Sequence, residues 1–392
     1  MRRGLPFLLL LAPALALAAL GVLMVTSTTA HHATAAFGDP RHFVVRQVIA
    51  TALGGVLALA IARAGPARVL QAAPVIFLVA LVAAVSVFIP GIGVRAAGAR
   101  RWLHIGALTG SPAPILTIAV ALIISAWGRD PEDAPAPLRV GHPPAAGSPP
   151  PRTRTADPTT RLVLALAMAV AALLALVIEP DFSAAGIAGA VGLAALAGLG
   201  FRGRRLLPAA AALVLALVLI ASQFAYVSGR LRGFLAPERD RHGKGFEVLA
   251  IARATAVATP GGAGLGHGEA RHRLSSPGSD YVFAIVTEEM GKTVARGVVL
   301  AWLAIAAAAA LVARGLGDRR MRALALSSAL AMVAPAALHI AVCTGLVPII
   351  GVTMPLVSYD PAATLAAGAA IGLIASIALK APVRTPELAE AR

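Results

Sequence analysis

Three carboxylates lie close together in a polar interval of this otherwise apolar chain, and such acids could take or give a proton in catalysis. Asp280, Glu288 and Glu289 belong to the interval 228–292 and follow a glycine-rich run at 259–268. Paired acids could hydrolyse a glycosidic bond, but eight helical residues between Asp280 and Glu288 would separate them by about 12 Å. Because paired glycosidase carboxyls lie about 5 to 9.5 Å apart, this spacing disfavours hydrolysis.

Basic side chains surround these acids. Arg271 and Arg273 precede the aspartate, Lys292 follows the glutamates, and Arg100 and Arg101 occupy another polar segment. Guanidinium groups suit diphosphate oxygens because they form bidentate, charge-assisted bonds. Outer-loop arginines also meet anionic lipid headgroups. The set therefore predicts either a clamp for a diphosphate or contacts with the membrane surface.

The two glutamates and the glycine run each admit more than one interpretation. An acid in or beside a membrane helix is costly to bury unless it is paired or faces a wet cavity. Glu288 and Glu289 are therefore expected to line a cavity or to pair with a loop arginine. The run 259–268 follows no strand and lacks the Gly-Lys-Ser/Thr ending of a phosphate-binding loop, so we expect a flexible lid.

No tight metal site is expected. The only cysteine, Cys343, lies in an apolar run, which leaves no disulfide and no cysteine cluster. The histidines show no His-Glu-x-x-His spacing for zinc. No cofactor is therefore required by the pattern, although a divalent cation could bind loosely at a diphosphate.

Composition determines what positions these residues. The 392-residue chain is 58% hydrophobic and 13% charged, with a mean hydropathy of +0.82, which is typical of a membrane protein that crosses the bilayer many times. A window of about 20 residues, the length needed to cross the hydrocarbon, predicts an all-α fold of about ten transmembrane helices in one domain, 1–392. The predicted helices lie near 5–25, 43–62, 69–89, 112–127, 162–178, 184–200, 206–227, 294–313, 323–346 and 362–380.

The positions of Lys and Arg predict the orientation of this bundle. They are concentrated in the short loops that share a side with the N-terminus, so both termini are expected in the cytoplasm. The interval 228–292, between the seventh and eighth helices, then becomes a large extracytoplasmic loop. The first apolar run could be a signal peptide, but its length favours a retained helix.

Two further features follow from composition. The interval 129–161 is rich in Pro, Ala and Arg and cannot bury a core, which predicts a cytoplasmic linker. The net charge of +16 is spread over many loops without a basic stripe or an aromatic platform, so membrane orientation explains it and nucleic acid is not an expected partner.

Several loop motifs also occur in a recognisable order. Together they resemble the SEDS family (shape, elongation, division and sporulation), whose members include FtsW and RodA. The motifs are Gly98-Ala99-Arg100-Arg101-Trp102-Leu103 after the third helix, Glu179-Pro180-Asp181-Phe182 after the fifth, Ser279-Asp280-Tyr281-Val282-Phe283-Ala284 and Glu288-Glu289-Met290-Gly291 in the long loop, and Met354-Pro355-Leu356-Val357-Ser358-Tyr359 before the last helix.

The resemblance implies an enzyme of the bacterial cytoplasmic membrane. It would polymerise lipid II into glycan strands at the outer face, together with a class B penicillin-binding transpeptidase. Asp280 matches the catalytic aspartate and is the expected general base, although an aspartate there could instead cap the following helix. The resemblance also implies that Asp181 and Ser358 contact substrate, although Glu179-Pro180-Asp181 could equally be a tight outer turn.

The chain departs from the family pattern at three places. The fourth helix begins Ser111-Pro112-Ala113-Pro114-Ile115-Leu116-Thr117, without the family's Glu and Lys. The last motif continues as Ser358-Tyr359-Asp360-Pro361-Ala362 in place of Ser-Tyr-Gly-Gly-Ser. The approach to Asp280 is reduced to Leu274-Ser275-Ser276-Pro277-Gly278-Ser279.

Three functions stay open at this stage. The first is a glycosyltransferase that uses Asp280, and the second is a flippase for a lipid-linked precursor. A non-catalytic scaffold of the division or elongation machinery is the third. A transporter is expected to place charges near the bilayer midplane and to show two related halves, whereas this chain keeps its charges in loops, which favours the enzyme.

Overall fold

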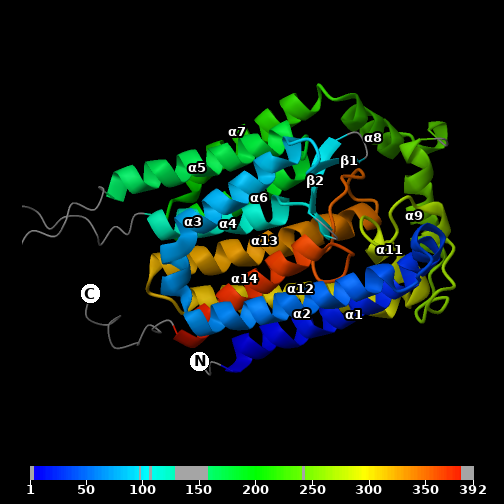
Figure 1. The fold of residues 1–392 in the computed structure, drawn as a ribbon, viewed down its shortest axis with the longest axis horizontal. Coiled ribbons are helices and arrows are strands. Elements are labelled where there is room, and N and C mark those ends of the chain that lie inside the picture. The colour runs from blue at the N-terminus through cyan, green and yellow to red at the C-terminus, as the bar shows by residue number, and fades with distance from the viewer. Residues whose placement is uncertain (1–3, 97–98, 106–107, 129–157, 241–242, 381–392) are drawn as a thin grey trace, which may run out of the picture.

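The computed structural model describes residues 4–96, 99–105, 108–128, 158–240 and 243–380. Long helices run side by side along the longest axis of the molecule (Figure 1). Shorter helices and a small sheet gather at one end of this bundle. The cavity described below lies where the long helices meet these shorter elements.

Ten of the helices follow the apolar segments of the sequence. They are α1 (Gly4–Phe37), α2 (His42–Ala64), α3 (Pro66–Val85), α4 (Ala113–Trp127), α5 (Pro158–Ile178), α6 (Phe182–Gly198), α7 (Gly203–Ala221), α12 (Gly291–Arg314), α13 (Arg319–Cys343) and α14 (Pro361–Lys380). Eight of them are long and apolar enough to cross a membrane, whereas α4 and α6 are shorter. The predicted class of a mostly helical membrane protein is confirmed, and the number of ten crossings stays a prediction.

Two boundaries differ most from the sequence prediction. Helix α1 does not stop near residue 25 but continues to Phe37. The segment 26–36 is rich in Ala and Thr and contains no Pro or Gly that would end the helix. Helix α7 ends at Ala221, and residues 225–235 form a separate helix, α8. The small residues Ser27–Ala30, which follow the first apolar run, therefore lie within a continuous helix.

The polar interval is folded into short helices. These are α8 (Ala225–Leu235), α9 (Lys244–Val257), α10 (Ala270–Arg273) and α11 (Val282–Glu289), with one-turn 3-10 segments at Ser86–Phe88 and Pro237–Arg239. The segment after α3 forms a three-stranded antiparallel sheet from β1 (Gly93–Ala96), β2 (Ala99–Ile105) and β3 (Leu108–Gly110), which the all-helical prediction lacked.

Small residues allow the helices to approach closely. A Cβ atom built at Gly368 of α14 would lie 2.4 Å from the carbonyl oxygen of Gly54 in α2, and one at Gly372 would lie 2.6 Å from that of Ala58. Close packing of this kind holds helices together in lipid, where the hydrophobic effect does not drive their association. Helices α2 and α14 are therefore tightly packed, and Ala363, Ala366 and Ala367 of α14 line the cavity.

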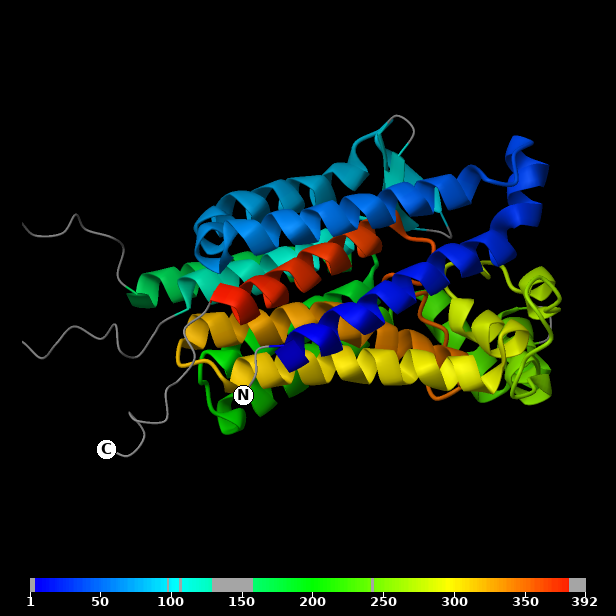
Figure 2. The ribbon, with the colours of Figure 1, turned by 90° about the horizontal axis from the view of Figure 1, so that it is seen from below.

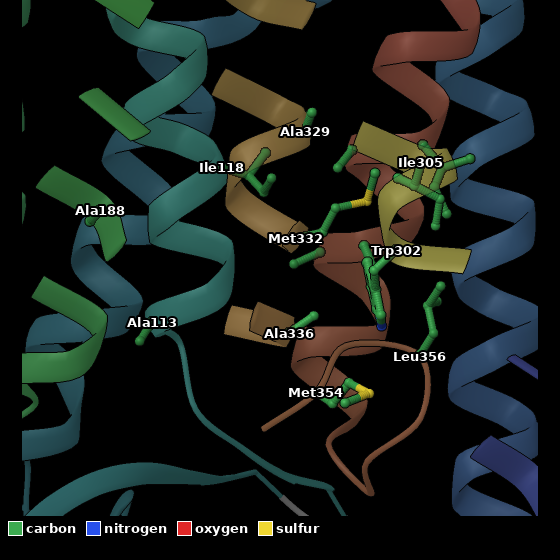
Figure 3. Packing of buried hydrophobic residues seen from close by; sticks show 14 of the residues in the cluster. Ala113, Ile118, Ala188, Trp302, Ile305, Ala329, Met332, Ala336, Met354 and Leu356 are labelled. Carbon is green, nitrogen blue, oxygen red and sulfur yellow. The ribbon is translucent and has the colours of Figure 1, made fainter. Parts of the chain in front are cut away.

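Larger side chains fill the centre of the bundle next to the cavity. Figure 3 shows Ile118 of α4, Met332 of α13 and Trp302 of α12 in the space between these helices. All three are buried, as is Met354 in the loop before α14. This packing fixes the N-terminal ends of α4 and α14, which carry residues of the site.

The two ends of the bundle carry different segments of the chain. Figures 1 and 2 place the start of α1 and the end of α14 at one end, opposite α8, α9 and α11. At that first end the Lys380 ammonium donates to the Arg63 carbonyl oxygen, and Arg319 lies beside Gly200. The loops predicted to be cytoplasmic thus share one end. Most of the predicted linker, 129–157, and both chain termini lie outside the described residues.

Candidate functional site

A cavity of about 290 Å³ opens at the end of the bundle that carries α8–α11 and the sheet. Segments far apart in the sequence contribute its walls. Its polar lining consists of Arg101, Ser111, Thr117, Asp181, Ser183, Arg230, Ser276, Ser279, Asp280, Thr353 and Asp360. Of the residues selected from the sequence, Asp280, Arg101 and Asp181 come together here.

Asp280 lies in the turn between α10 and α11, and its backbone N–H donates to the Ser276 carbonyl oxygen at 3.0 Å. Helix α11 begins at Val282, and the side chain of its N-cap residue, Tyr281, makes no capping bond. The carboxylate of Asp280 therefore lines the cavity and does not cap this helix. Burial raises the pKa of Asp280, and the positive charge of Arg230 partly opposes this shift.

Ser358 holds the backbone of the Asp280 turn from behind. Its hydroxyl donates to the Ser279 carbonyl oxygen at 2.6 Å and accepts from the Met354 N–H at 2.9 Å. The Tyr359 N–H donates to the Gly278 carbonyl oxygen at 2.8 Å. Ser358 is 1% exposed and is absent from the cavity lining, so it positions the turn and lies one layer behind the surface that a substrate would contact.

Two buried side chains hold helix α11 next to this turn. The His339 Nε2 accepts from the Phe283 N–H at 3.3 Å while its Nδ1 lies 2.7 Å from the Val352 carbonyl oxygen. Accepting at one ring nitrogen and donating at the other requires the neutral imidazole. Similarly, the Tyr281 hydroxyl donates to Glu247 of α9 at 3.0 Å. These long-range bonds fix the position of Asp280.

Two guanidinium groups face the same space. Arg101 of β2 lies 3.9 Å from the Asp181 carboxylate, and Arg230 of α8 lies over the Tyr226 ring at 5.2 Å. A Cβ atom built at Gly351 would lie 3.7 Å from both Arg230 Nη2 and Asp280 Oδ2, so the glycine leaves room between these groups. Arg230 was not selected from the sequence. Its one signal is that it interrupts the mostly apolar segment 224–231, close to the end of α7.

Three helices begin at this cavity. Asp181 accepts from the Ala184 N–H at the start of α6, and Asp360 accepts from the Ala363 N–H at the start of α14. Helix α4 begins at Ala113, which also lines the cavity. Helix N-termini carry partial positive charge. Because carboxylates already cap α6 and α14, the positive charge of the pocket comes from the two arginines and the N-terminus of α4, which suit an anion beside a carboxylate base.

The two glutamates have a structural role away from the cavity. Glu288 accepts from the N–H groups of Glu269 and Ala270, each at 3.0 Å. Glu289 accepts from the Ser27 hydroxyl and from the Gly268 N–H. Neither lines the cavity. Donors of the loop and of α1 occupy both carboxylates, so neither expectation, a cavity wall or a pair with an arginine, is met.

The glycine run packs on α11 and does not cover the cavity. The Ala263 N–H donates to the Glu288 carbonyl oxygen at 2.9 Å, and the Lys292 N–H donates to that of Thr259 at 3.1 Å. Gly262 has a φ of 79°, and a Cβ there would lie 2.3 Å from the Glu289 carbonyl oxygen. The expected lid is therefore corrected: the glycines allow close backbone packing.

The remaining selected cations also lie elsewhere. Arg271 donates to the Ser27 carbonyl oxygen at 3.3 Å, and Arg273 donates to Glu269 at 3.1 Å. Lys292 is the second residue of α12 and lies beside the glycine run, and the exposed Arg100 donates to the Phe88 carbonyl oxygen. None of these four cations lines the cavity. A clamp for a diphosphate would therefore use Arg101 and Arg230.

Within the described part of the chain, no three His, Cys, Asp or Glu side chains are grouped so that they could hold a metal ion. Cys343 is buried and free. A divalent cation that arrives with a diphosphate stays a prediction.

Comparison with known proteins gives a consistent picture. The family described as "Cell cycle protein" (FtsW, RodA, SpoVE) matches residues 7–382. A protein of Halorhodospira halophila named "Probable peptidoglycan glycosyltransferase FtsW" is 32% identical over 92% of this chain and 87% of its own length. Its Mycobacterium tuberculosis namesake is 28% identical over 96% of this chain and 68% of its own length.

Solved structures show the same fold. A chain from "Structural coordination of polymerization and crosslinking by a peptidoglycan synthase complex" aligns with a TM-score of 0.69 at 20% identity, covering 94% of this chain and 96% of that one. The rod shape determining protein RodA of Thermus thermophilus aligns with a TM-score of 0.63 at 19% identity, covering 94% and 95%.

Proposed function

The chain belongs to the FtsW, RodA and SpoVE family, and from this premise we propose that it is a peptidoglycan glycosyltransferase that polymerises lipid II. The observation that supports this most directly is the position of Asp280 in a cavity beside Arg101 and Arg230. A base and an anion-binding group are what transfer of a sugar from a lipid diphosphate requires.

In the proposed reaction one proton is transferred, one glycosidic bond forms and one bond to the diphosphate breaks. The Asp280 carboxylate accepts the proton of a sugar hydroxyl on the acceptor. The hydroxyl oxygen then attacks the anomeric carbon of the donor. The bond between that carbon and the diphosphate oxygen breaks, and the electron pair leaves with the lipid diphosphate. General-base assistance of this kind contributes about 10²- to 10⁴-fold in rate.

The surroundings of Asp280 suit a base. Burial raises the pKa of its carboxyl, which makes the ionised form a stronger proton acceptor, and Arg230 keeps that form accessible. A base of this kind must be ionised at the working pH. The backbone bonds from Ser358 and Tyr359 hold the turn so that little reorganisation is needed when the proton moves.

The leaving group would lie against Arg101 and Arg230. The N-terminal end of α4 adds partial positive charge at the same place, whereas carboxylates already cap the ends of α6 and α14. This arrangement bears on the absence of Glu and Lys at the start of α4. In this chain that wall contributes Ser111 and Thr117, while the positive charges come from β2 and α8.

We also propose the cellular setting. The chain would lie in the cytoplasmic membrane with both termini inside, and the cavity would open at the outer face, where lipid II is used. A class B penicillin-binding transpeptidase is the proposed partner, supported by the structural match to a chain of a peptidoglycan synthase complex. The role would be in cell division or in cell shape.

The direct test is lipid II polymerisation by the purified protein, alone and with the transpeptidase encoded in the same organism. Asp280→Asn removes the base while keeping the shape of the side chain, and Asp39→Asn is a matched control at an exposed turn between α1 and α2. Glycan strands are expected from the wild type and the control but not from Asp280→Asn.

Two other outcomes would overturn the proposal. Full activity of Asp280→Asn would remove the base from the mechanism. If the wild type makes no strands in any pairing while a related family member polymerises the same substrate, the chain is a scaffold or a flippase.

A further inference from the structure

Glu179 occupies the short turn between α5 and α6, and the mechanism above does not use it. Its side chain is 0% exposed. Neither of its carboxylate oxygens has a hydrogen-bond partner. An ionised carboxylate without donors is among the most costly groups to bury, so a group in this position is expected to hold a proton.

The charges around the turn are few. Asp181 lies two residues further along the chain, and Arg101 approaches from β2. From α8, Tyr226 donates its hydroxyl to the Pro180 carbonyl oxygen at 2.9 Å, and Arg230 faces the same cavity. Helix α4 contains no charged residue.

The remaining neighbours of the turn do not add charge. The arginines of α3 and α7 lie in the first turns of those helices, at the opposite end of the bundle. Burial raises the pKa of Glu179 to about 8, and the charge of Asp181 adds to this while Arg101 opposes it. Glu179 therefore keeps its proton at neutral pH, because its carboxyl group is buried and has no hydrogen-bond donor.

Arg101 is the cation that both acids of the turn share. Its contact with Asp181 is long, at 3.9 Å, and its buried Nε has no hydrogen-bond partner. If Glu179 were ionised, it would attract the Arg101 guanidinium and would add a second negative charge beside Asp181. In its neutral form Glu179 does neither, and the guanidinium stays oriented toward the cavity that it lines.

We propose that Glu179 is a positioning residue whose uncharged carboxylic acid form leaves Arg101 to the anionic group of the ligand. This inference rests on the proposed function in one respect: the anionic group is taken to be the diphosphate of the lipid substrate. Loss of the proton to solvent converts the turn from a neutral support of Arg101 into a competitor for it. Anion binding in the cavity therefore weakens when Glu179 ionises.

The test compares the wild type with Glu179→Gln, which keeps the shape of the neutral acid and cannot ionise. Farnesyl diphosphate serves as the probe, and farnesol, which lacks the diphosphate, is the control ligand. Binding to the purified full-length protein is measured from about pH 6 to about pH 9.5, a range that brackets ionisation of the buried acid. Glu269→Gln, an exposed acid far from the cavity, is the matched variant.

In the wild type and in Glu269→Gln, the affinity for farnesyl diphosphate is expected to fall above about pH 8, approaching tenfold per pH unit where the ionised form binds poorly. In Glu179→Gln this fall is expected to be absent, with the affinity at neutral pH unchanged. Farnesol binding is expected to show no such dependence.

The outcomes separate the two proposals. If the probe binds and all three proteins share one pH profile, Glu179 does not control Arg101 and this inference is wrong, while the diphosphate site stands. If the diphosphate probe binds no better than farnesol at every pH, the proposed anion site itself is overturned, and this inference with it.

Infrared difference spectra give a second reading that needs no ligand. The wild type at neutral pH is expected to show the carbonyl band of a protonated carboxylic acid that disappears at alkaline pH and is missing in Glu179→Gln. A wild type without that band at neutral pH would contradict the neutral form of Glu179.

Discussion

Two regions of this molecule contain the same kinds of residue and use them differently. The cavity combines Asp280 with Arg101 and Arg230, whereas the loop around α10 combines Glu288 with Arg271 and Arg273. In the loop, the Glu288 carboxylate is saturated by two backbone N–H donors. In the cavity, the carboxylate faces open space beside cations. The difference shows that access to a cavity lined by cations, more than residue type, distinguishes a candidate for chemistry from a structural acid.

The largest expected effect comes from the cavity. Asp280→Asn is expected to reduce the rate of polymerisation about 10²- to 10⁴-fold by removing the base. Because a buried charge is also removed, the melting temperature should not fall. Rates are measured on purified protein whose thermal unfolding is followed in parallel. A slow variant that also unfolds early would instead place Asp280 with the structural acids.

Arg230→Gln tests the cation on the cavity side of the comparison. The loss of a charge-assisted bond to the diphosphate should weaken substrate binding by about 1.5–3 kcal/mol, which is about 10- to 150-fold in KM. The change in kcat should be smaller. Steady-state kinetics over a range of lipid II concentrations will separate the effect on KM from the effect on kcat. An unchanged KM would remove Arg230 from the clamp.

The pH dependence of the rate sharpens the role of Asp280. Burial raises its folded pKa above the ordinary value, so the base becomes protonated, and the rate falls, as the pH drops through that raised pKa. Below it the rate should decline by about tenfold per pH unit. Measured rates of the wild type between neutral and acidic pH test this, and an acidic limb at the ordinary pKa of an exposed aspartate would contradict the burial.

Glu288→Gln tests the loop side. Replacing the carboxylate weakens two bonds to backbone N–H groups and should lower the free energy of unfolding by about 1–3 kcal/mol. The rate per folded molecule should stay near that of the wild type, because the side chain does not reach the cavity. Thermal unfolding and polymerisation are measured on the same preparation. A loss of rate without loss of stability would return Glu288 to the substrate site.

The smallest effect is expected at Arg273. Its ion pair with Glu269 is largely exposed, and such pairs contribute about 0–1 kcal/mol. Arg273→Gln should therefore leave KM for lipid II and the melting temperature nearly unchanged. A tenfold rise in KM would show that this loop contacts the diphosphate.

Local sequence carried much of the fold. Runs of apolar residues predicted the long helices, because the length and hydrophobicity of each run indicate a membrane helix without knowledge of distant contacts. Boundaries were less secure: the polar segment after residue 25 continues α1, since nothing in it breaks a helix. The sheet at 93–110 was missed because its strands are short and lie among loop residues.

The candidate site was only partly predictable. Asp280, Arg101 and Asp181 were selected by their motifs, and the structure places all three at one cavity. Arg230 could not be distinguished from the other cations of the long loop, because only the folding of α8 against the cavity brings it there. Ser358 was selected as a substrate contact, yet it acts on the backbone behind Asp280.

The sequence by itself determined the membrane class, the helical segments and the family, since these depend on local composition and on the order of motifs. Only the tertiary structure decided which acids face a cavity and which are saturated by backbone donors. Glu179, Asp280 and Glu288 look alike in a sequence. Their different surroundings arise from contacts between segments that lie far apart along the chain, and these contacts set whether a carboxyl is neutral, basic or structural.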